Sequence, residues 1–137
     1  MSRSLTARVL TPEGMRSVDV ELSYDPSCPY AVTATFLGDA APVSWTFARD
    51  LLILGQYEPV GSGDVHIRPE VDDAERAAVL LELRSPGGIG IALLPAMEVN
   101  EFVEASTESV RPGAESDHLD IDAAVHAVLV GEAGPGA

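Results

Sequence analysis

The segment WTFARDLLILG, residues 45–55, decides the fold because it joins a strand pattern directly to a helix pattern. Trp45 and Phe47 alternate with polar residues, as is typical of a β-strand that buries one face. The following ARDLLILG carries three leucines, which predict a helix of about two turns that stops at Gly55. Arg49 and Asp50 lie at this junction, and the pattern alone leaves open whether they form a site or a charged step on the helix.

Upstream of this junction the chain alternates apolar and polar residues in several short runs. The clearest is SVDVELSY, residues 17–24, in which Val18, Val20 and Leu22 fall on one face. That period of two predicts a half-buried strand. The other upstream strands are predicted at residues 5–9, 30–36 and 43–47.

Downstream, a strand is predicted at 65–69, a hairpin of strands at 78–85 and 89–95, a helix at 96–106, a linker at 111–118 and a helix at 119–130. The hairpin follows from the turn Pro86-Gly87-Gly88 between two apolar runs. The element order predicts an antiparallel-rich α+β protein with two antiparallel β-sheets, each followed by a covering helix. We expect one domain over residues 1–130 and a flexible tail at 131–137.

The charge disfavours polyanionic partners. The 137 residues hold 22 acidic and 8 basic side chains, for a net charge of −14, and every basic residue is arginine. Neutralising a phosphate backbone requires clustered lysine and arginine. Nucleic acid and anionic membrane surfaces are therefore disfavoured, and a cationic or neutral protein surface is expected instead.

The segment MSRSLTARVL at the start has no long apolar run, so no secretory signal is expected. The longest apolar stretches are too short to span a membrane. A lone cysteine, Cys28, excludes an internal disulfide and suits a reducing compartment. These features predict a cytoplasmic protein without direct membrane insertion.

The candidate metal and catalytic patterns are all incomplete. The three histidines, His66, His118 and His126, lack the spacing and number of ligands that zinc requires. The acids Asp117, Asp120 and Asp122 lack the glycine of a calcium loop and are expected near a helix N-terminus. GSGD, residues 61–64, lacks the lysine of a phosphate loop. No cofactor and no metal are predicted.

The sequence also shows no set of residues for nucleophilic or acid–base catalysis. Cys28 has no assigned base beside it, and no Gly-x-Ser-x-Gly motif is present. Asp72 and Asp73 lie in a charged loop without an apolar shell that could raise a pKa. The chain is therefore expected not to be an enzyme.

Arg49 and Asp50 have two interpretations. They form a solvated helix face, or an ion pair with the loop around Asp64. Alternatively, they form a recognition spot beside Trp45 and Phe47, because arginine and aromatic residues dominate interface hot spots.

These residues, with motifs on either side, resemble those of one known family. The central matches are Trp45, Phe47 to Leu52, Gly55, Pro59, Gly61, Gly63 to Val65 and Pro69. The flanking matches are Tyr24-Asp25, Pro29 to Val32, Ala34 to Phe36, Ser85-Pro86, Gly88, Pro95, Phe102, Pro112-Gly113, Glu115 and Leu119 to Asp122. On this pattern the chain resembles the SsgA-like proteins, which regulate sporulation and cell division in filamentous, spore-forming bacteria.

The resemblance implies a fold similar to the whirly-type single-stranded nucleic-acid binders, assembled as a homotrimer. It implies an adaptor that is recruited to the septum and positions FtsZ or another part of the division machinery, or that binds another SsgA-like protein. It carries no catalytic residues. Arg49 and Asp50 are then expected to be structural or at a subunit contact, with Trp45 and Asp64 beside them as a possible partner surface.

Two other functions stay open at this stage. The first is a paralogue that directs peptidoglycan synthesis or autolysis during spore-wall maturation and spore separation. The second is a single-stranded nucleic-acid binder by fold, which the acidic charge and the absence of lysine disfavour. A trimer also has a physical motive, because residues 78–83 and 89–94 are apolar on both faces and a partner subunit could cover the second face.

Overall fold

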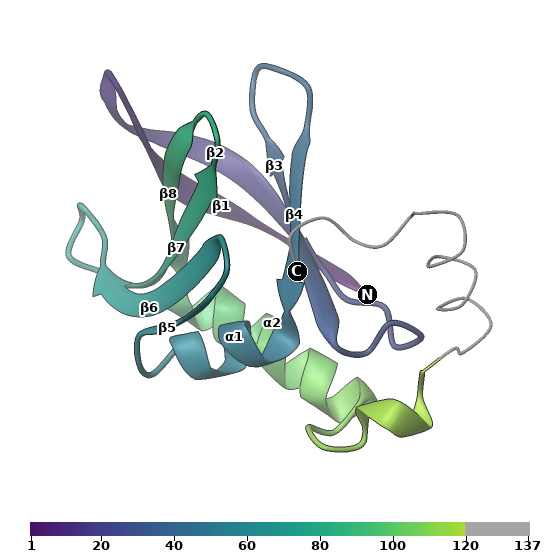
Figure 1. Ribbon diagram of the computed structural model, residues 1–137. Helices are drawn as coiled ribbons and strands as arrows, with labels where there is room; N and C mark the ends of the chain where they lie inside the picture. Colours follow the sequence, from purple (N-terminus) through teal and green to yellow (C-terminus); the bar gives the residue numbers. More distant parts are fainter. Residues whose placement is uncertain (120–137) are drawn as a thin grey trace.

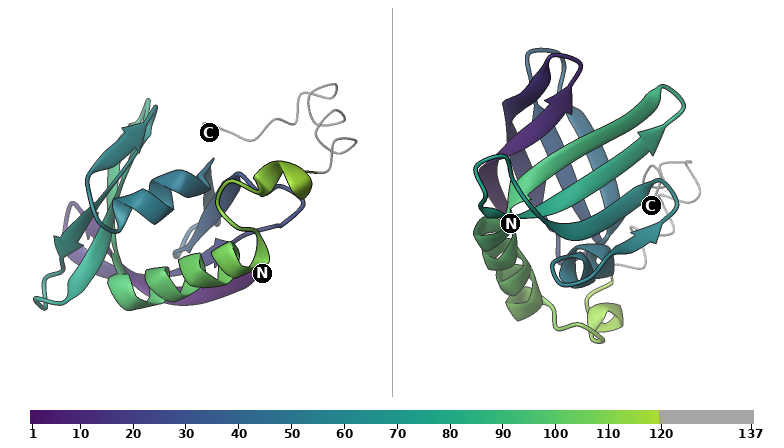
Figure 2. Two further views of the ribbon diagram at one scale, coloured as in Figure 1. Left: turned by 90° about the horizontal axis from the view of Figure 1, so that it is seen from below. Right: turned by 90° about the vertical axis from the view of Figure 1, so that its left-hand side faces the viewer.

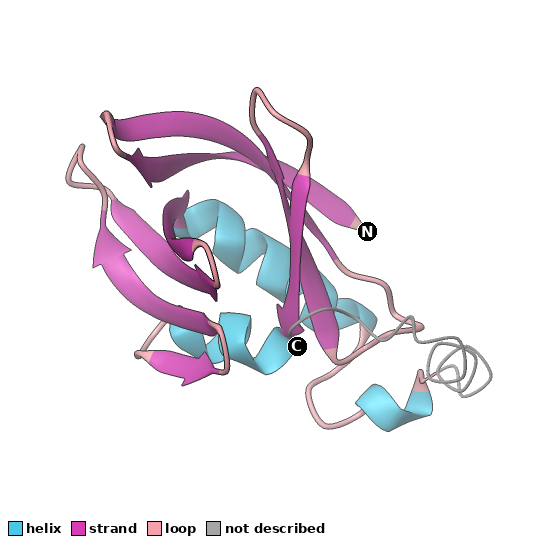
Figure 3. Cartoon of the chain, turned by 45° about the horizontal axis from the view of Figure 1, so that its top comes forward, coloured by secondary structure: helices cyan, strands magenta, loops and turns pink. Residues whose placement is uncertain are grey.

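The computed structural model describes residues 1–119. Within that range the chain forms strands and helices in the order β1 (Ser2–Thr11), β2 (Gly14–Ser23), β3 (Ala31–Leu37), β4 (Val43–Ala48), α1 (Arg49–Gly55), β5 (Val60–Ser62), β6 (Val65–Val71), β7 (Ala77–Ser85), β8 (Gly88–Pro95), α2 (Ala96–Ser109) and the short 3-10 helix η1 (Glu115–Asp117). The predicted α+β class and antiparallel pairing are confirmed (Figure 3).

The strands form one sheet and not two, which corrects the sequence prediction. Its order is β4-β3-β2-β1-β8-β7-β6-β5, and every described pairing is antiparallel. The two four-stranded halves meet where β1 pairs with β8 through only Arg8–Leu93 and Val9–Ala92. This join links residues that are far apart in sequence, so no local pattern could reveal it.

The sheet curls so that its two halves stand at an angle, with both helices along one side (Figures 1 and 2). The prediction that each half is covered by the helix that follows it agrees with α2 but not with α1. Helix α1 follows β4 but packs against β5 and β6 of the second half. Helix α2 contacts β7, β8 and β1 and so bridges the join between the halves.

The core lies on the concave face of the curled sheet. Alternate residues of each strand point inward, as the period of two predicts. The helices add Leu52, Val99 and Phe102, each at most 1% exposed. The buried strand residues are Leu5, Ala7, Val20, Leu22, Val32, Ala34, Phe47, Val65, Ile67, Val79, Leu81, Leu83, Ala92 and Leu94. Burying one large apolar side chain contributes about 1.5–3 kcal/mol, so this shared layer stabilises the curl.

The first hairpin is longer than its predicted strands because its pairing continues in both directions. The register runs from Thr11–Gly14 at the turn to Ser2–Ser23 at the open end. Gly14 has a φ of 113°, which side chains rarely adopt, and the Thr11 hydroxyl donates a hydrogen bond to its carbonyl. The turn chemistry thus fixes the register of β1 on β2.

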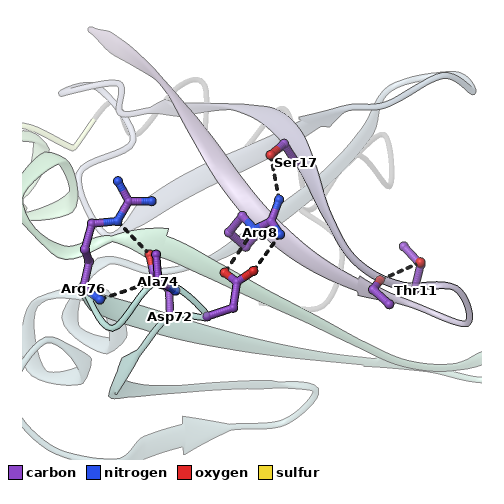
Figure 4. A network of polar contacts seen from close by, with 8 residues as sticks. Arg8, Thr11, Ser17, Asp72, Ala74 and Arg76 are labelled. Atoms are coloured by element: carbon purple, nitrogen blue, oxygen red, sulfur yellow. Dashed lines mark hydrogen bonds and ion pairs between the residues drawn. The ribbon is translucent and has the colours of Figure 1, made fainter.

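A side-chain bridge reinforces the short join between the halves (Figure 4). Arg8 of β1 donates to both carboxylate oxygens of Asp73, at 3.1 and 2.7 Å, and to the Ser17 hydroxyl at 2.9 Å. The Asp73 carboxylate lies in the loop between β6 and β7, and the Arg8 hydrogen bonds lower its pKa. Neighbouring Asp72 also has a lowered pKa, chiefly because it accepts the Arg76 backbone N–H. Neither acid therefore has the raised pKa of a general acid, as the sequence predicted.

The second face of β7 and β8 is partly covered within the chain. Ala78, Leu80 and Leu93 are less than 10% exposed, and Met15 and Ile91 pack against them. The apolar second face that the sequence assigned to a partner subunit is therefore satisfied in part without one.

Several boundaries and elements differ from the prediction. Strand β5 was not predicted, since its three residues lie in a glycine-rich turn. Helix α2 extends to Ser109, and the predicted linker at 111–118 contains η1. The predicted helix at 119–130 and the tail at 131–137 lie outside the described residues, apart from Leu119.

Gly55 ends α1, as predicted, and lies against β6. A Cβ atom at this position would meet Cγ2 of Ile67 and approach its Cβ to 2.7 Å. We expect Gly55→Ala to lower the free energy of unfolding by about 1–3 kcal/mol, because overpacking forces the helix off the strand. Urea unfolding of Gly38→Ala is the control, since a Cβ there meets nothing within 4 Å. Equal stability of the two variants would contradict this packing.

Candidate functional site

The structure does not bring the four predicted site residues together. Arg49 is buried, with 1% of its surface exposed, whereas Asp50 beside it is exposed. Trp45 is half-buried on β4, and it lines a surface hollow that Asp64 also lines. The sequence-predicted set therefore divides into a buried arginine and a surface that includes Trp45 and Asp64.

Arg49, the first residue of α1, contacts the end of α2, the segment that contains η1, and the turn between β2 and β3. Its Nη1 donates to the carbonyl oxygens of Ser106 at 3.0 Å and Val110 at 2.7 Å. Its Nη2 donates to Oε2 of Glu115 at 3.0 Å. The Ser106 carbonyl also accepts the Val110 backbone N–H that caps α2, so the guanidinium is its second donor, and the Val110 carbonyl lies just past the end of the helix. A cation at this helix end is also favoured by the helix dipole.

Tyr24 covers the other side of the arginine. The guanidinium carbon lies 5.0 Å from the centre of the tyrosine ring, within the range of a cation–π interaction. The Tyr24 hydroxyl donates to the Pro29 carbonyl at 2.9 Å, and the Arg49 backbone N–H donates to the Tyr30 carbonyl at 2.8 Å. Burial raises the pKa of Tyr24, with the nearby Arg49 charge acting in the opposite direction. The turn between β2 and β3 is therefore fixed to the same arginine.

Glu115 is the partner that the reasoning on Arg49 missed. It is 6% exposed, and its Oε1 accepts the Gly113 backbone N–H at 2.6 Å. Its own backbone N–H lowers the pKa of its carboxyl most, and the hydrogen bond from Arg49 lowers it further. The pair is ionised and buried, with hydrogen bonds on both partners. The only signal in the sequence was the Pro112-Gly113 and Glu115 match to the family pattern.

Both local interpretations of Arg49 are therefore wrong. A solvated helix face fails because the side chain points into the interior, and an ion pair near Asp64 fails because Glu115 occupies the guanidinium. Within residues 1–119 the guanidinium is buried and its contacts are those of a structural residue, which is one of the two roles that the resemblance implies. Its role within the described residues is structural.

The surface around Trp45 is hollowed and largely apolar. A hollow of about 330 Å³ lies between β4 and the β7–β8 hairpin, lined by Val43, Ser44, Trp45, Asp64, Arg84, Ser85 and Pro86. A second hollow of about 460 Å³ shares Val43 and Trp45 and continues over Phe36, Leu83 and Ile91. Trp45 forms the common wall of both, so this surface suits contact with apolar side chains.

The other candidate residues are not gathered into a site. Within residues 1–119, no group of three or more His, Cys, Asp or Glu is placed to hold a metal ion. His66 lies on β6 and the exposed Cys28 in the β2–β3 turn, while His126, Asp120 and Asp122 lie outside the described residues. In the same described range, no helix is long and apolar enough to cross a membrane.

The buried arginine gives a stability prediction. Arg49→Ala removes a buried ion pair and strands the Glu115 carboxylate, which costs about 3–5 kcal/mol in comparable sites. Arg84→Ala is the matched control, because Arg84 pairs with Glu82 on the surface and such pairs contribute under about 1 kcal/mol. Urea unfolding of both variants measures the difference. A loss for Arg49→Ala no larger than that for Arg84→Ala would contradict the structural role.

Comparisons with known proteins agree with the pattern of residues. The family model described as "Streptomyces sporulation and cell division protein, SsgA" matches residues 18–115. The sporulation-specific cell division protein SsgB of Saccharopolyspora erythraea is 44% identical over 113 residues, covering 82% of this chain and 79% of its own. SsgB of Streptomyces coelicolor is 37% identical over 122 residues, covering 88% of each chain.

Solved structures show the same fold. An SsgA-like sporulation-specific cell division protein from Thermobifida fusca superposes with a TM-score of 0.80 at 34% identity, covering 92% of this chain and 93% of its own. A structure described with SsgB mutations that correlate to longitudinal cell division during sporulation of Streptomyces coelicolor also has a TM-score of 0.80, at 37% identity, covering 86% and 94%. The chain therefore belongs to the SsgA family of sporulation and cell division proteins, and it is similar to the SsgB members of that family.

Proposed function

We propose that this chain is a non-enzymatic regulator of sporulation-specific cell division that acts as an adaptor at septum sites. Family membership carries the proposal, because relatives at 37–44% identity are named sporulation-specific cell division proteins. The adaptor is cytoplasmic until it is recruited to the septum, where it positions FtsZ and the division machinery, directly or through another SsgA-like protein. It uses neither nucleic acid nor a cofactor.

The surface around Trp45 supports a role in protein contact. Trp45 and Val43 form apolar walls beside Asp64, and aromatic side chains dominate the energetics of protein interfaces. Arg49, in contrast, is occupied by Glu115 and two backbone carbonyls. In this proposal the chain presents Trp45 and Val43 to a partner, while Arg49 stabilises the fold.

The homotrimer is part of the same proposal. Large apolar side chains remain exposed on a single chain, among them Leu10 at 51% and Ile89 at 61%. Contact between subunits would remove such side chains from water, which is favourable at about 25 cal/mol per Å². The internal cover of Leu80 and Leu93 reduces the apolar area available on β7 and β8.

Imaging of a fluorescent fusion alongside FtsZ in sporulating cells tests the adaptor role. We expect the fusion to reach future septa before FtsZ or together with it. Val43→Glu should abolish this arrival, because it places a charge in the hollow, whereas Val71→Glu should not. Both valines are 54% exposed on strands, so they are matched in burial.

The order of arrival decides between the two septal functions. A fusion that arrives only after the rings, or along walls between maturing spores, would contradict recruitment of FtsZ. It would favour guidance of peptidoglycan synthesis or autolysis. Absence from septa at every stage would contradict both functions.

Light scattering of the purified full chain tests the trimer. We expect a mass three times that of one chain, because subunit contact covers apolar side chains that the monomer exposes. A monomer mass at micromolar concentration would contradict it.

A further inference from the structure

The sheet has two free edges among the described residues, β4 and β5. Strand β5 has three residues, which is too short to offer a partner much backbone. Strand β4 has six residues, Val43–Ala48. An edge strand presents unpaired N–H and C=O groups and is a template for another strand. Strand β4 is therefore the edge at which strand addition could occur.

The register identifies which groups of β4 are free. The Arg49 N–H donates to the Tyr30 carbonyl, and Ala48 is the residue opposite Ala31. Hydrogen-bonded and non-hydrogen-bonded pairs alternate in an antiparallel ladder. The odd-numbered residues of β4 therefore bond to β3, and the N–H and C=O groups of Ser44, Thr46 and Ala48 point out from the edge.

Strand β4 lacks the features by which proteins usually protect an edge. Its sequence VSWTFA contains no charged residue and no proline. Its pairing with β3 runs without a bulge from Phe36–Val43 to Ala31–Ala48. Edges that carry no lysine, proline or bulge readily accept a further strand. Among residues 1–119 this strand is thus a continuous edge that no further strand covers.

The hollow beside β4 provides room for the side chains of an added strand. Its walls are Val43 and Trp45 on one side and the Arg84 to Pro86 turn on the other, around a volume of about 330 Å³. Alternate side chains of an extended segment that pairs with β4 would point to this concave side. Apolar residues at every second position would therefore fill the hollow.

Arg84 also lines the hollow but is paired with Glu82 at 3.0 Å, so two acids set the charge of the segment that fits. Asp64 lines the hollow, and Asp50 follows the last residue of β4 by two positions. Both are exposed, and neither forms an ion pair within residues 1–119. Nearby Asp39, in contrast, is paired with Arg16. With a net charge of −14 on the whole chain, a basic residue in the segment would be favoured.

We propose that the free edge of β4 binds an extended segment of a partner protein as a ninth strand of the sheet. The segment carries apolar residues at alternate positions and at least one basic residue. Main-chain hydrogen bonds to Ser44 and Thr46 provide affinity, and the Trp45 hollow provides selectivity. The proposal deepens the proposed function in one respect, because it takes the partner to be a component of the division machinery.

Ser44→Pro tests the outward-facing backbone N–H of β4 separately from the pairing of β4 with β3. Proline removes the outward N–H of Ser44 and leaves the hydrogen bonds between β4 and β3 in place, since proline is tolerated on edge strands. Ser44→Ala is the matched control, because it loses the same hydroxyl, which contacts Thr35 at 2.9 Å, but keeps the N–H. Thermal unfolding of both variants verifies that the fold is retained, and Thr46→Pro with Thr46→Ala repeats the pair should Ser44→Pro fail to fold.

The probes are synthetic peptides of about eight residues, a typical strand length. One alternates valine and threonine and ends in arginine. A second replaces the arginine by glutamate, and a third groups the valines so that the alternation is lost. Binding is measured by fluorescence anisotropy, and amide exchange of Ser44 and Thr46 is followed by NMR.

The arginine peptide should bind the full chain and slow exchange at Ser44 and Thr46. Ser44→Pro should weaken binding about tenfold or more, as expected for one lost hydrogen bond and displaced neighbours, whereas Ser44→Ala should not. Equal binding by both variants, no protection of the two amides, or equal binding of all three peptides would overturn the proposal. If slow exchange at the Ser44 and Thr46 amides instead increases with protein concentration in the absence of peptide, a second copy occupies the edge. That result would overturn the proposal too.

Imaging separates this proposal from the proposed function. If wild type and Ser44→Pro reach septa equally well, the septal function stands and strand addition to β4 is wrong. If the wild type never reaches septa, the proposed function is wrong, whatever the peptides show.

Discussion

The buried guanidinium of Arg49 holds together the end of α2, the η1 segment and the turn between β2 and β3. Arg49 binds the end of α2 through two carbonyls, the η1 segment through Glu115, and the β2–β3 turn through Tyr24. A desolvated cation is costly unless all its surroundings are in place. Because each of these segments is needed to satisfy the charge, the arginine couples their positions to one another.

The sequence was informative wherever structure is local. The alternation in residues 17–24 predicted β2, and the Pro86-Gly87-Gly88 turn predicted the β7–β8 hairpin. Its predictions failed where partners are distant. Glu115 lies 66 residues after Arg49, and β1 meets β8 through two residue pairs. No periodicity or propensity encodes such contacts, so the local pattern gave Arg49 a solvated face or a pairing near Asp64, only the resemblance allowed a structural role, and one sheet was taken for two. Trp45 and Asp64 were identified as a possible contact surface, and they do share a hollow.

The 45–55 segment directs neighbouring side chains both into the core and onto the surface, because side chains alternate along a strand and wind around a helix. Along β4, Phe47 joins the core while Trp45 opens onto the hollow, and at the start of α1 Arg49 turns inward. The buried pair and the proposed contact surface are therefore adjacent in sequence and separated in space. A surface of this kind can change without loss of the buried pair, because function is carried by sites on a fold and not by the fold itself.

The narrow join between β1 and β8 also constrains the order in which the chain can assemble. Each four-stranded half is a series of neighbouring hairpins, so most of its contacts close short loops. The pairing of β1 with β8 instead requires Arg8 to contact Leu93, which is far along the chain. Closing the loop between these two residues is slow relative to hairpin formation. Among the strand pairings of residues 1–119, contact between strands that do not follow one another in the chain is thus confined to one join, and a newly made chain must complete α2 before that join is covered.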